Sequence, residues 1–266
     1  MSEENTKKIN PLLERIRLPG ETFRLPSLAL FYKNGELDGS VVGGELHVYP
    51  MTTIDEIILK TPDRLMNGDA IREVFSRCIP QVRDTSRLLS KDVDYLLACL
   101  RLTTYGPDME ITYRHNCVDA KEHSYMVPLR PLLQKAKPID PTTLGTSFKH
   151  VLQNGQVISF RPPLFESVIK LSQAIDFAPS DITAEEYGKL IIRTLANMIE
   201  SVDEITDQEL IFDWLVALGA GWVREVSDAV NAVSDWGVNF KHELVCKDCN
   251  EPITIEISTN PLTFFM

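Results

Sequence analysis

The sequence lacks the features of a membrane or secreted protein. It has no run of about 18 apolar residues, the length that a membrane-spanning helix needs. Its first eight residues, Met1 to Lys8, are polar and contain no apolar stretch of signal-peptide type. We therefore expect a protein that is made in the cytoplasm, with no membrane-spanning segment.

Cysteine and positive charge are also scarce. The cysteines are odd in number and few for a chain of this length, which does not suit a disulfide framework and favours a reducing compartment. They are Cys78, Cys99, Cys117, Cys246 and Cys249. Lys and Arg total 27 against 38 Asp and Glu, a net charge of −11. Because an acidic surface repels phosphate and no Lys/Arg run interrupts it, we expect no nucleic-acid partner.

No spaced catalytic motif is present. Gly43-Gly44 lacks the pattern of a phosphate-binding loop. The acidic run from Asp203 to Glu209 lies at a helix junction, where negative charge favours the N-terminus of the following helix. The sequence therefore predicts a protein that is not an enzyme and has no catalytic residues.

The order of strand and helix signals predicts an α+β fold. Hydrophobic residues make up 44% of the 266 residues and charged residues 24%, which is ordinary for a globular protein. Strand signals cluster before Pro162 and after Gly237, so we expect antiparallel hairpins, some of zinc-knuckle type, with a segregated helical block. Four segments follow: an extended N-terminal arm (1–25), a mixed region with β-hairpins (26–162), a helical region (163–237) and a C-terminal knuckle hairpin that packs on the middle β region (238–266).

Apolar periodicity and turn residues locate the elements. Strands are expected over Ser27–Phe31, Val41–Tyr49, Glu110–Tyr113, Ser124–Leu129, Ser147–Gln153 and Gln156–Arg161, and on either side of a loop within Phe240–Ser258. Asn154-Gly155 predicts a type I′ hairpin turn. Helices are expected over Thr53–Lys60, Asp69–Cys78 and Ser90–Thr104, and from Pro162 to Gly237. Capping boxes are expected at Thr53/Glu56, Thr183/Glu186 and Thr206/Glu209.

The most specific local motif is Cys246-Lys247-Asp248-Cys249. Two thiolates at this spacing, at the tip of a hairpin, point at one position and supply half of a tetrahedral zinc site. A redox pair would need a helix after the first cysteine. Pro252 and the alternating isoleucines that follow it predict a strand instead, which favours a metal over redox chemistry.

A second hairpin offers the remaining ligands. The segment Ile111 to Cys117 has a similar shape to Leu244 to Cys249, but Arg114 stands where the first cysteine would be. We therefore expect Cys117, Cys246 and Cys249 to converge, with His115 as the fourth ligand and His123 in reserve. Four protein ligands would make a closed, structural zinc site. The alternative is a pair of hairpins that never binds metal, and Cys78 and Cys99 are expected to be buried packing residues.

The order of these pieces carries a resemblance to a known family. Leu25-Pro26-Ser27 precedes the stretch Leu46 to Glu56, which is followed by Phe75 to Pro80, Asp94 to Arg101 and the knuckle-like hairpin. This pattern is similar to the baseplate hub assembly proteins and hub subunits of T-even-like contractile-tailed bacteriophages. The resemblance implies no catalytic residues, other baseplate and tail proteins as partners, and a location at the hub of the virion tail.

Three hypotheses for the function stay open at this point. The first is a virion baseplate subunit that acts by protein–protein assembly, and the second is an assembly factor that leaves before the tail matures. The third is a zinc-ribbon regulatory protein, which the charge of −11 disfavours. Mass spectrometry of purified virions separates the first from the second.

Overall fold

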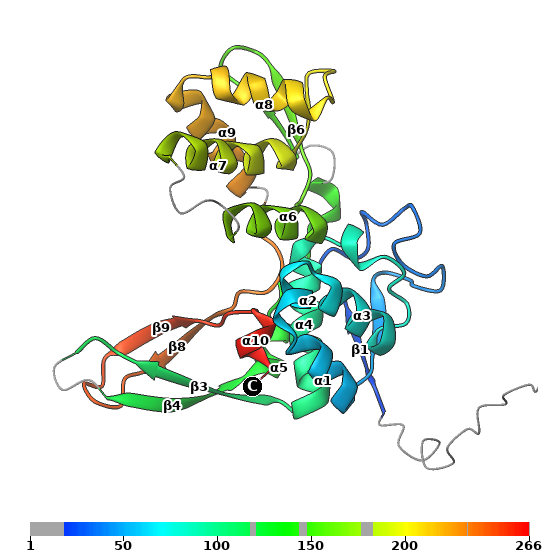
Figure 1. Ribbon diagram of the computed structural model, residues 1–266, viewed down its shortest axis with the longest axis vertical. Coiled ribbons are helices and arrows are strands. Elements are labelled where there is room, and N and C mark those ends of the chain that lie inside the picture. Colours follow the sequence, from blue (N-terminus) through cyan, green and yellow to red (C-terminus); the bar gives the residue numbers. More distant parts are fainter. Residues whose placement is uncertain (1–18, 118–120, 144–147, 177–182, 233, 266) are drawn as a thin grey trace, which may run out of the picture.

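The computed structural model describes residues 19–117, 121–143, 148–176, 183–232 and 234–265. Figure 1 shows three parts: a main core of helices, a β arm that projects from it, and an upper lobe at the other end of the molecule. The main core and the upper lobe contain helices and antiparallel strand pairs, and the β arm contains antiparallel strand pairs. The predicted α+β fold is confirmed.

The main core is built around α4 (Ser90–Tyr105). This helix carries apolar residues on nearly every side, so its middle is buried from Asp92 to Leu102, with the exception of Asp94. Each fully buried leucine contributes on the order of 2 kcal/mol to stability. The surrounding elements are β1 (Glu21–Arg24), β2 (Glu45–Val48), α1 (Thr53–Leu59), α2 (Pro62–Met66), α3 (Asp69–Cys78), the 3-10 helix η2 (Thr85–Arg87), α5 (Leu129–Gln134) and the C-terminal α10 (Pro261–Phe264).

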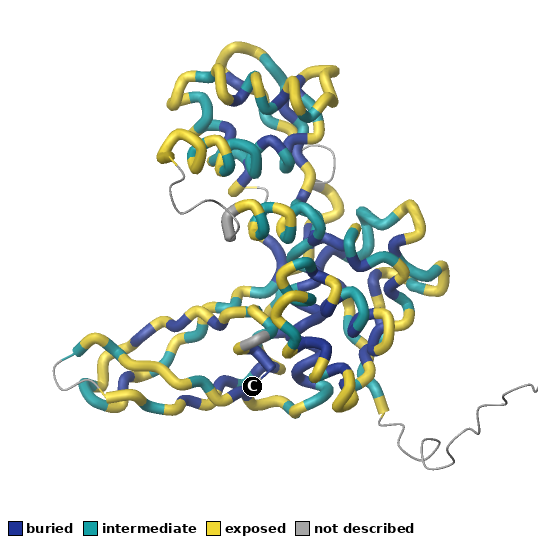
Figure 2. Tube along the Cα trace, viewed as in Figure 1, coloured by how far each residue is buried: buried dark blue, intermediate teal, exposed yellow. Residues whose placement is uncertain are grey.

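The β arm consists of two hairpins that pack face to face (Figure 1). One is β3 (Asp108–Arg114) with β4 (Glu122–Pro128), and the other is β8 (Lys241–Val245) with β9 (Pro252–Glu256). Buried and exposed residues alternate along these strands, as Figure 2 shows, because successive side chains point to opposite faces. The inner faces of the two hairpins therefore form a small apolar cluster between them.

The upper lobe has a hydrophobic core of its own. A three-stranded antiparallel sheet, in the order β5–β6–β7, packs against helices α7, α8 and α9. Its elements are β5 (Lys149–Val151), β6 (Val157–Phe160), α7 (Ala184–Met198), β7 (Ile199–Val202), α8 (Gln208–Ala217) and α9 (Ala220–Ala232). Helix α6 (Phe165–Asp176) contacts both this lobe and the main core. The short helix η3 (Pro141–Thr143) lies between α5 and β5 in the chain.

The predicted division at residue 162 does not follow the cores. Leu152, Ile158 and Phe160 lie before that boundary but are buried with α7, α8 and α9 in the upper lobe. The helical region also contains a strand, β7, which pairs with β6. This strand was not predicted, because Ile199–Val202 continues the apolar pattern of the preceding helix without a break.

The first predicted strand was wrong. Ser27–Phe31 forms a series of turns, in which Leu28 and Ala29 adopt left-handed φ angles of 54° and 60°. Strand β1 pairs with β2 instead, although it falls inside the predicted arm. Polar residues dominate β1, so it carries no apolar signal. Residues 1–18 of the arm, and Ser147 of a predicted strand, lie outside the described residues.

Strand β2 is shorter than the predicted Val41–Tyr49. It begins only at Glu45, because Gly43 and Gly44 take left-handed φ angles of 60° and 77°. A glycine has no Cβ, so it adopts this conformation without strain, but the conformation is incompatible with an extended strand.

The turn at Asn154-Gly155 differs from the predicted type I′. Such a turn needs a positive φ at both central residues, but only Gly155 has one, at 88°. The Gly155 N–H donates to the Leu152 carbonyl at 2.8 Å, and the Leu152 N–H donates to Gln156. This is the pattern of a type I turn followed by a bulge with glycine in the left-handed conformation.

The starts of α1, α3, α4, α7 and α8 are predicted to within one residue, whereas α6 begins at Phe165 rather than at Pro162, and α2, α5 and α10 were not predicted. The capping box of α7 at Thr183/Glu186 is confirmed. The first capping box lies at Thr52/Asp55, not at Thr53/Glu56. The third is absent, because Asp207 caps α8 directly by accepting the N–H groups of Glu209 and Leu210.

Candidate metal centre

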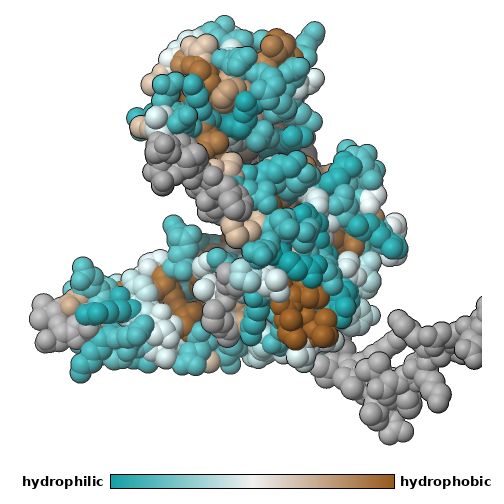
Figure 3. Space-filling view, viewed as in Figure 1, coloured by the Kyte–Doolittle hydropathy of each residue, from teal (hydrophilic) through white to brown (hydrophobic). Residues whose placement is uncertain are grey.

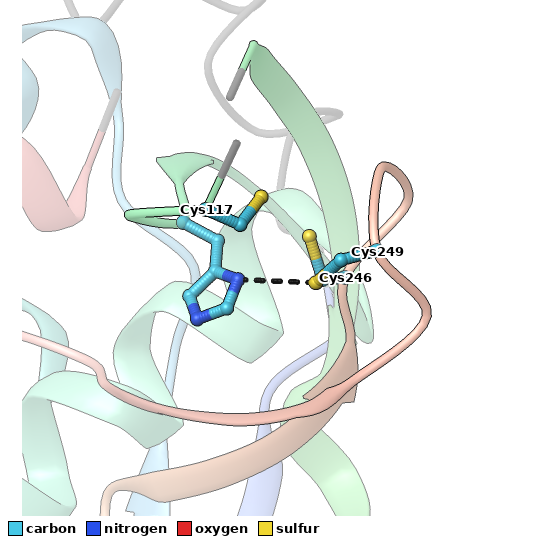
Figure 4. Close-up of side chains that lie close together, drawn as sticks. Cys117, Cys246 and Cys249 are labelled. Atoms are coloured by element: carbon cyan, nitrogen blue, oxygen red, sulfur yellow. Dashed lines mark hydrogen bonds between the residues drawn. The ribbon is translucent and has the colours of Figure 1, made fainter. Parts of the chain in front are cut away.

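The two hairpins of the β arm bring a histidine and three cysteines together at its tip. His115 and Cys117 follow β3, and Cys246 and Cys249 occupy the turn between β8 and β9. One ligand atom from each residue lies within 4.8 Å of all the others. Figure 4 shows Cys117 approaching from one hairpin and the other two cysteines from the second.

The spacing of these atoms is close to that of a tetrahedral site. Bonds of about 2.3 Å from zinc to sulfur place two sulfurs about 3.8 Å apart. The His115 Nδ1 lies 3.4 Å from the Cys249 sulfur, and Cys246 is 1% exposed. A contraction of about 1 Å at most would therefore bring all four atoms to bonding distance.

The turn that carries Cys246 and Cys249 is fixed by its own backbone. Asn250 takes a left-handed φ of 61°, and its N–H donates to the Cys246 carbonyl at 2.9 Å. The Cys246 N–H donates to the Glu251 carbonyl and closes the turn. This geometry points both sulfurs toward the other hairpin.

The surroundings shift the pKa values of two thiols in opposite directions. The backbone N–H groups of Cys249 and Asp248 point at the Cys246 sulfur and lower its pKa to about 6. Burial and the neighbouring cysteines raise the pKa of Cys117 to about 12. The cluster thus supplies a stabilised thiolate at Cys246 beside a Cys117 thiol that holds its proton at neutral pH.

His123, the predicted reserve ligand, lies outside this group. Its Nε2 is hydrogen-bonded to the Asp248 Oδ1 at 2.8 Å, while the Lys121 N–H donates to the other oxygen of the same carboxylate at 3.0 Å. The Asp248 carboxylate therefore joins the return strand of one hairpin to the turn of the other. These hydrogen bonds form a clasp between the hairpins that the sequence did not predict.

A second contact of the clasp involves Lys247. Its N–H donates to the Tyr125 hydroxyl at 3.3 Å, and its Nζ donates to the Ser124 carbonyl at 2.5 Å. The same ammonium lies 4.9 Å from the centre of the Tyr125 ring. The two central residues of Cys-Lys-Asp-Cys thus hold the hairpins together from outside the cysteine cluster.

Cys78 and Cys99 lie elsewhere, in the main core, and are 2% and 0% exposed. Burial raises the pKa of Cys78 to about 12 and raises that of Cys99 as well. Both behave as the small packing residues that the sequence predicts.

Within the described ranges, no helix has the length and apolar character needed to span a bilayer.

Comparison with protein families gives a match over most of the chain. The family model described as "T4 bacteriophage base plate protein" matches residues 43–266. The chain belongs to this family. The match covers both hairpins, the cysteine cluster and the upper lobe, and it begins just before β2.

Membership of the T4 bacteriophage base plate protein family confirms the resemblance seen in the sequence at the level of the family. It makes this a bacteriophage baseplate protein, whose partners are other tail proteins. No curated protein and no solved structure matches the chain.

Proposed function

We propose that the protein is a structural component of the contractile tail baseplate, at or next to the hub, and that it acts by protein–protein assembly without catalysis. The family match over residues 43–266 carries this proposal. A baseplate protein that remains in the virion has to bind its neighbours through its surface, so its exposed apolar residues are the relevant structural feature.

The main core has such a surface on α1. Figure 3 shows an apolar patch over this helix. Ile54 and Ile57 are 53% and 57% exposed, and Tyr49 and Tyr105, each 41% exposed, line a pocket with Thr53 and Glu56 of the same helix. Exposed apolar patches of this kind mark protein–protein contact sites, and tyrosine is enriched in such contacts.

The location is tested by mass spectrometry of purified virions. We expect the protein in stoichiometric amounts in intact tails and in isolated baseplates. A protein that is essential for tail formation but missing from virions would instead be a transient assembly factor. Labelling of the C-terminus, followed by electron microscopy of baseplates, tests the hub: density on the tail axis is expected, and density at the periphery contradicts the hub location.

We further propose that the cluster at the tip binds one zinc ion. His115, Cys117, Cys246 and Cys249 would fill all four positions of a tetrahedral site, leaving none for water. Such a site is structural, and its role would be to join the ends of the two hairpins. Three sulfurs and one nitrogen form a donor set that suits zinc, whereas magnesium and calcium prefer oxygen ligands.

Zinc is tested by elemental analysis of the purified protein, with one equivalent per chain expected. His115→Asn should reduce the bound zinc well below one equivalent, whereas His242→Asn, a matched change on β8 outside the cluster, should leave it unchanged. Protein with no stoichiometric zinc would contradict the metal proposal while leaving the baseplate assignment untouched.

A further inference from the structure

The upper lobe has an apolar groove between α6, α7 and α9. Its volume is about 400 Å³, within the range of pockets that accept ligands or side chains. Ile191, on its rim, is 55% exposed. The apolar residues along the groove include Leu171, Ile191, Ile192, Leu195, Met198 and Val223.

The part of the chain that carries this groove is acidic as a whole. Residues 163–232 contain thirteen acidic and four basic residues, a net charge of −9 out of −11 for the whole chain. Three of the four cations are already held by acidic neighbours, in the pairs Lys170–Glu166, Lys189–Glu185 and Arg193–Glu209. Helices α6, α7 and α9 themselves hold six acidic and four basic residues, a net charge of −2. The groove is therefore apolar inside and lies in a segment of negative charge, which favours a basic, amphipathic occupant.

The N-terminal segment of the chain has both properties. Residues 5–18 contain four basic residues and one acidic residue, a net charge of +3. No period extends over the whole segment, but Ile9, Leu12, Leu13 and Ile16 have the spacing i, i+3, i+4, i+7. This spacing places apolar side chains on one face of a helix, as in peptides that bind a groove.

The location of the segment decides which copy it meets. The described chain begins at Pro19, beside β1, at the opposite end of the molecule from the upper lobe (Figure 1). Ile16 is three residues from Pro19 and can lie no more than about 11 Å from it. A helix over residues 9–16 would add only about 11 Å to that reach, so we infer that the segment meets the groove of another copy rather than its own.

We propose that residues 5–18 of one copy bind the groove of a second copy. This contact is heterologous, because the two copies contribute different surfaces. Heterologous contacts repeat from copy to copy, so they build rings or open chains rather than closing at a dimer. The proposal does not depend on the zinc site or on the hub location.

Sedimentation velocity of the full chain tests the contact. The wild type should associate beyond the dimer as its concentration rises, and should associate less at high salt, because screening weakens the attraction between charges. The double variant Leu12→Asp/Leu13→Asp and the variant Ile191→Asp should each stay monomeric. Leu210→Asp, a change at a 56% exposed residue of α8 outside the groove, should associate like the wild type.

Mixing the two monomeric variants gives the sharpest test. The Ile191→Asp chain retains its segment and the Leu12→Asp/Leu13→Asp chain retains its groove, so one contact forms between them and the mixture should stop at dimers. Four outcomes overturn the proposal: a monomeric wild type, association that survives either variant, loss of association in Leu210→Asp, or a mixture without dimers. Circular dichroism of each variant shows whether its fold is retained.

Discussion

At the scale of single residues, Asp92 is a carboxylate that is fully buried in the main core. It lies on α4 with 0% exposure. Its Oδ2 accepts a hydrogen bond from the Tyr32 hydroxyl at 2.5 Å, and its Oδ1 accepts the Ser27 N–H at 3.2 Å. Burial raises its pKa to about 6, and these hydrogen bonds only partly oppose that rise. Asp92 thereby holds the turns at 27–32 against the main core.

This pKa predicts a specific dependence of stability on pH. An aspartate in the unfolded chain has a pKa of about 3.9, so between about pH 4 and 6 the folded state binds more protons. The contribution of Asp92 to the free energy of unfolding therefore falls as pH rises through that window, by about 3 kcal/mol. Urea denaturation at pH 4.5 and pH 7 captures about 2 kcal/mol of this change, as the difference between wild type and Asp92→Asn.

The variant should lack this part of the pH dependence, because an amide does not titrate. Asp63→Asn, a change at an exposed residue of α2, serves as the control and should keep the dependence of the wild type. An identical pH profile for wild type and Asp92→Asn would contradict the assignment.

The cysteines of the candidate site were predictable from the sequence, but the surrounding contacts were not. The Cys-x-x-Cys spacing alone identifies Cys246 and Cys249, and its likeness to the earlier hairpin identifies Cys117. The choice between His115 and His123 depends on the register of β3 and β4, in which Tyr113 pairs with His123. That register commits His123 to Asp248, and no short-range pattern encodes a contact between residues 125 positions apart.

At the scale of elements, the starts of α7 and α8 give a matched test of capping. Thr183 caps α7, and its hydroxyl accepts the Glu186 N–H at 3.2 Å. Asp207, rather than Thr206, caps α8. Thr183→Ala and Asp207→Ala should each lower the free energy of unfolding by about 1 kcal/mol, because each leaves helix N–H groups without an acceptor.

Thr206→Ala is the control for this prediction and should change stability by less than about 0.5 kcal/mol. Urea denaturation of the three variants measures the differences. A larger loss from Thr206→Ala than from Asp207→Ala would mean that α8 begins one residue earlier.

Elements with a strong apolar period were predictable, and those without one were not. Helix α3 was predicted with its exact bounds, because Ile71, Val74, Phe75 and Cys78 form one buried stripe. Strand β1 was missed, because Phe23 is its only apolar residue. Strand β7 was missed because its pairing with β6 is a long-range contact that overrides the local preference.

At the scale of the whole molecule, the N-terminal segment should matter for assembly but not for folding. The buried residues of the main core begin at Leu25 among those described, so removal of residues 1–18 takes away no described core residue. The truncated chain should keep the melting temperature of the wild type to within about 2 °C. Its incorporation into baseplates, measured by complementing a phage that lacks the gene, should fall. A truncated chain that fails to fold would contradict this prediction.

The separation of the hydrophobic cores predicts how far the loss of a metal would spread. The apolar cluster of the β arm shares Ile111 and Leu244 with the main core, whereas the core of the upper lobe shares no residue with it. Metal binding and local folding are coupled, so a chelator should loosen the tips of both hairpins. Hydrogen exchange should accelerate in β3, β4, β8 and β9 and stay unchanged in α7, α8 and α9.

The hydrogen bonds of Asp248 do not depend on the metal, so after chelation the four strands should keep part of their protection. Asp248→Asn combined with chelation should remove this remaining protection. Equal acceleration in the upper lobe would mean that the molecule opens as one unit and that the metal site stabilises the entire fold.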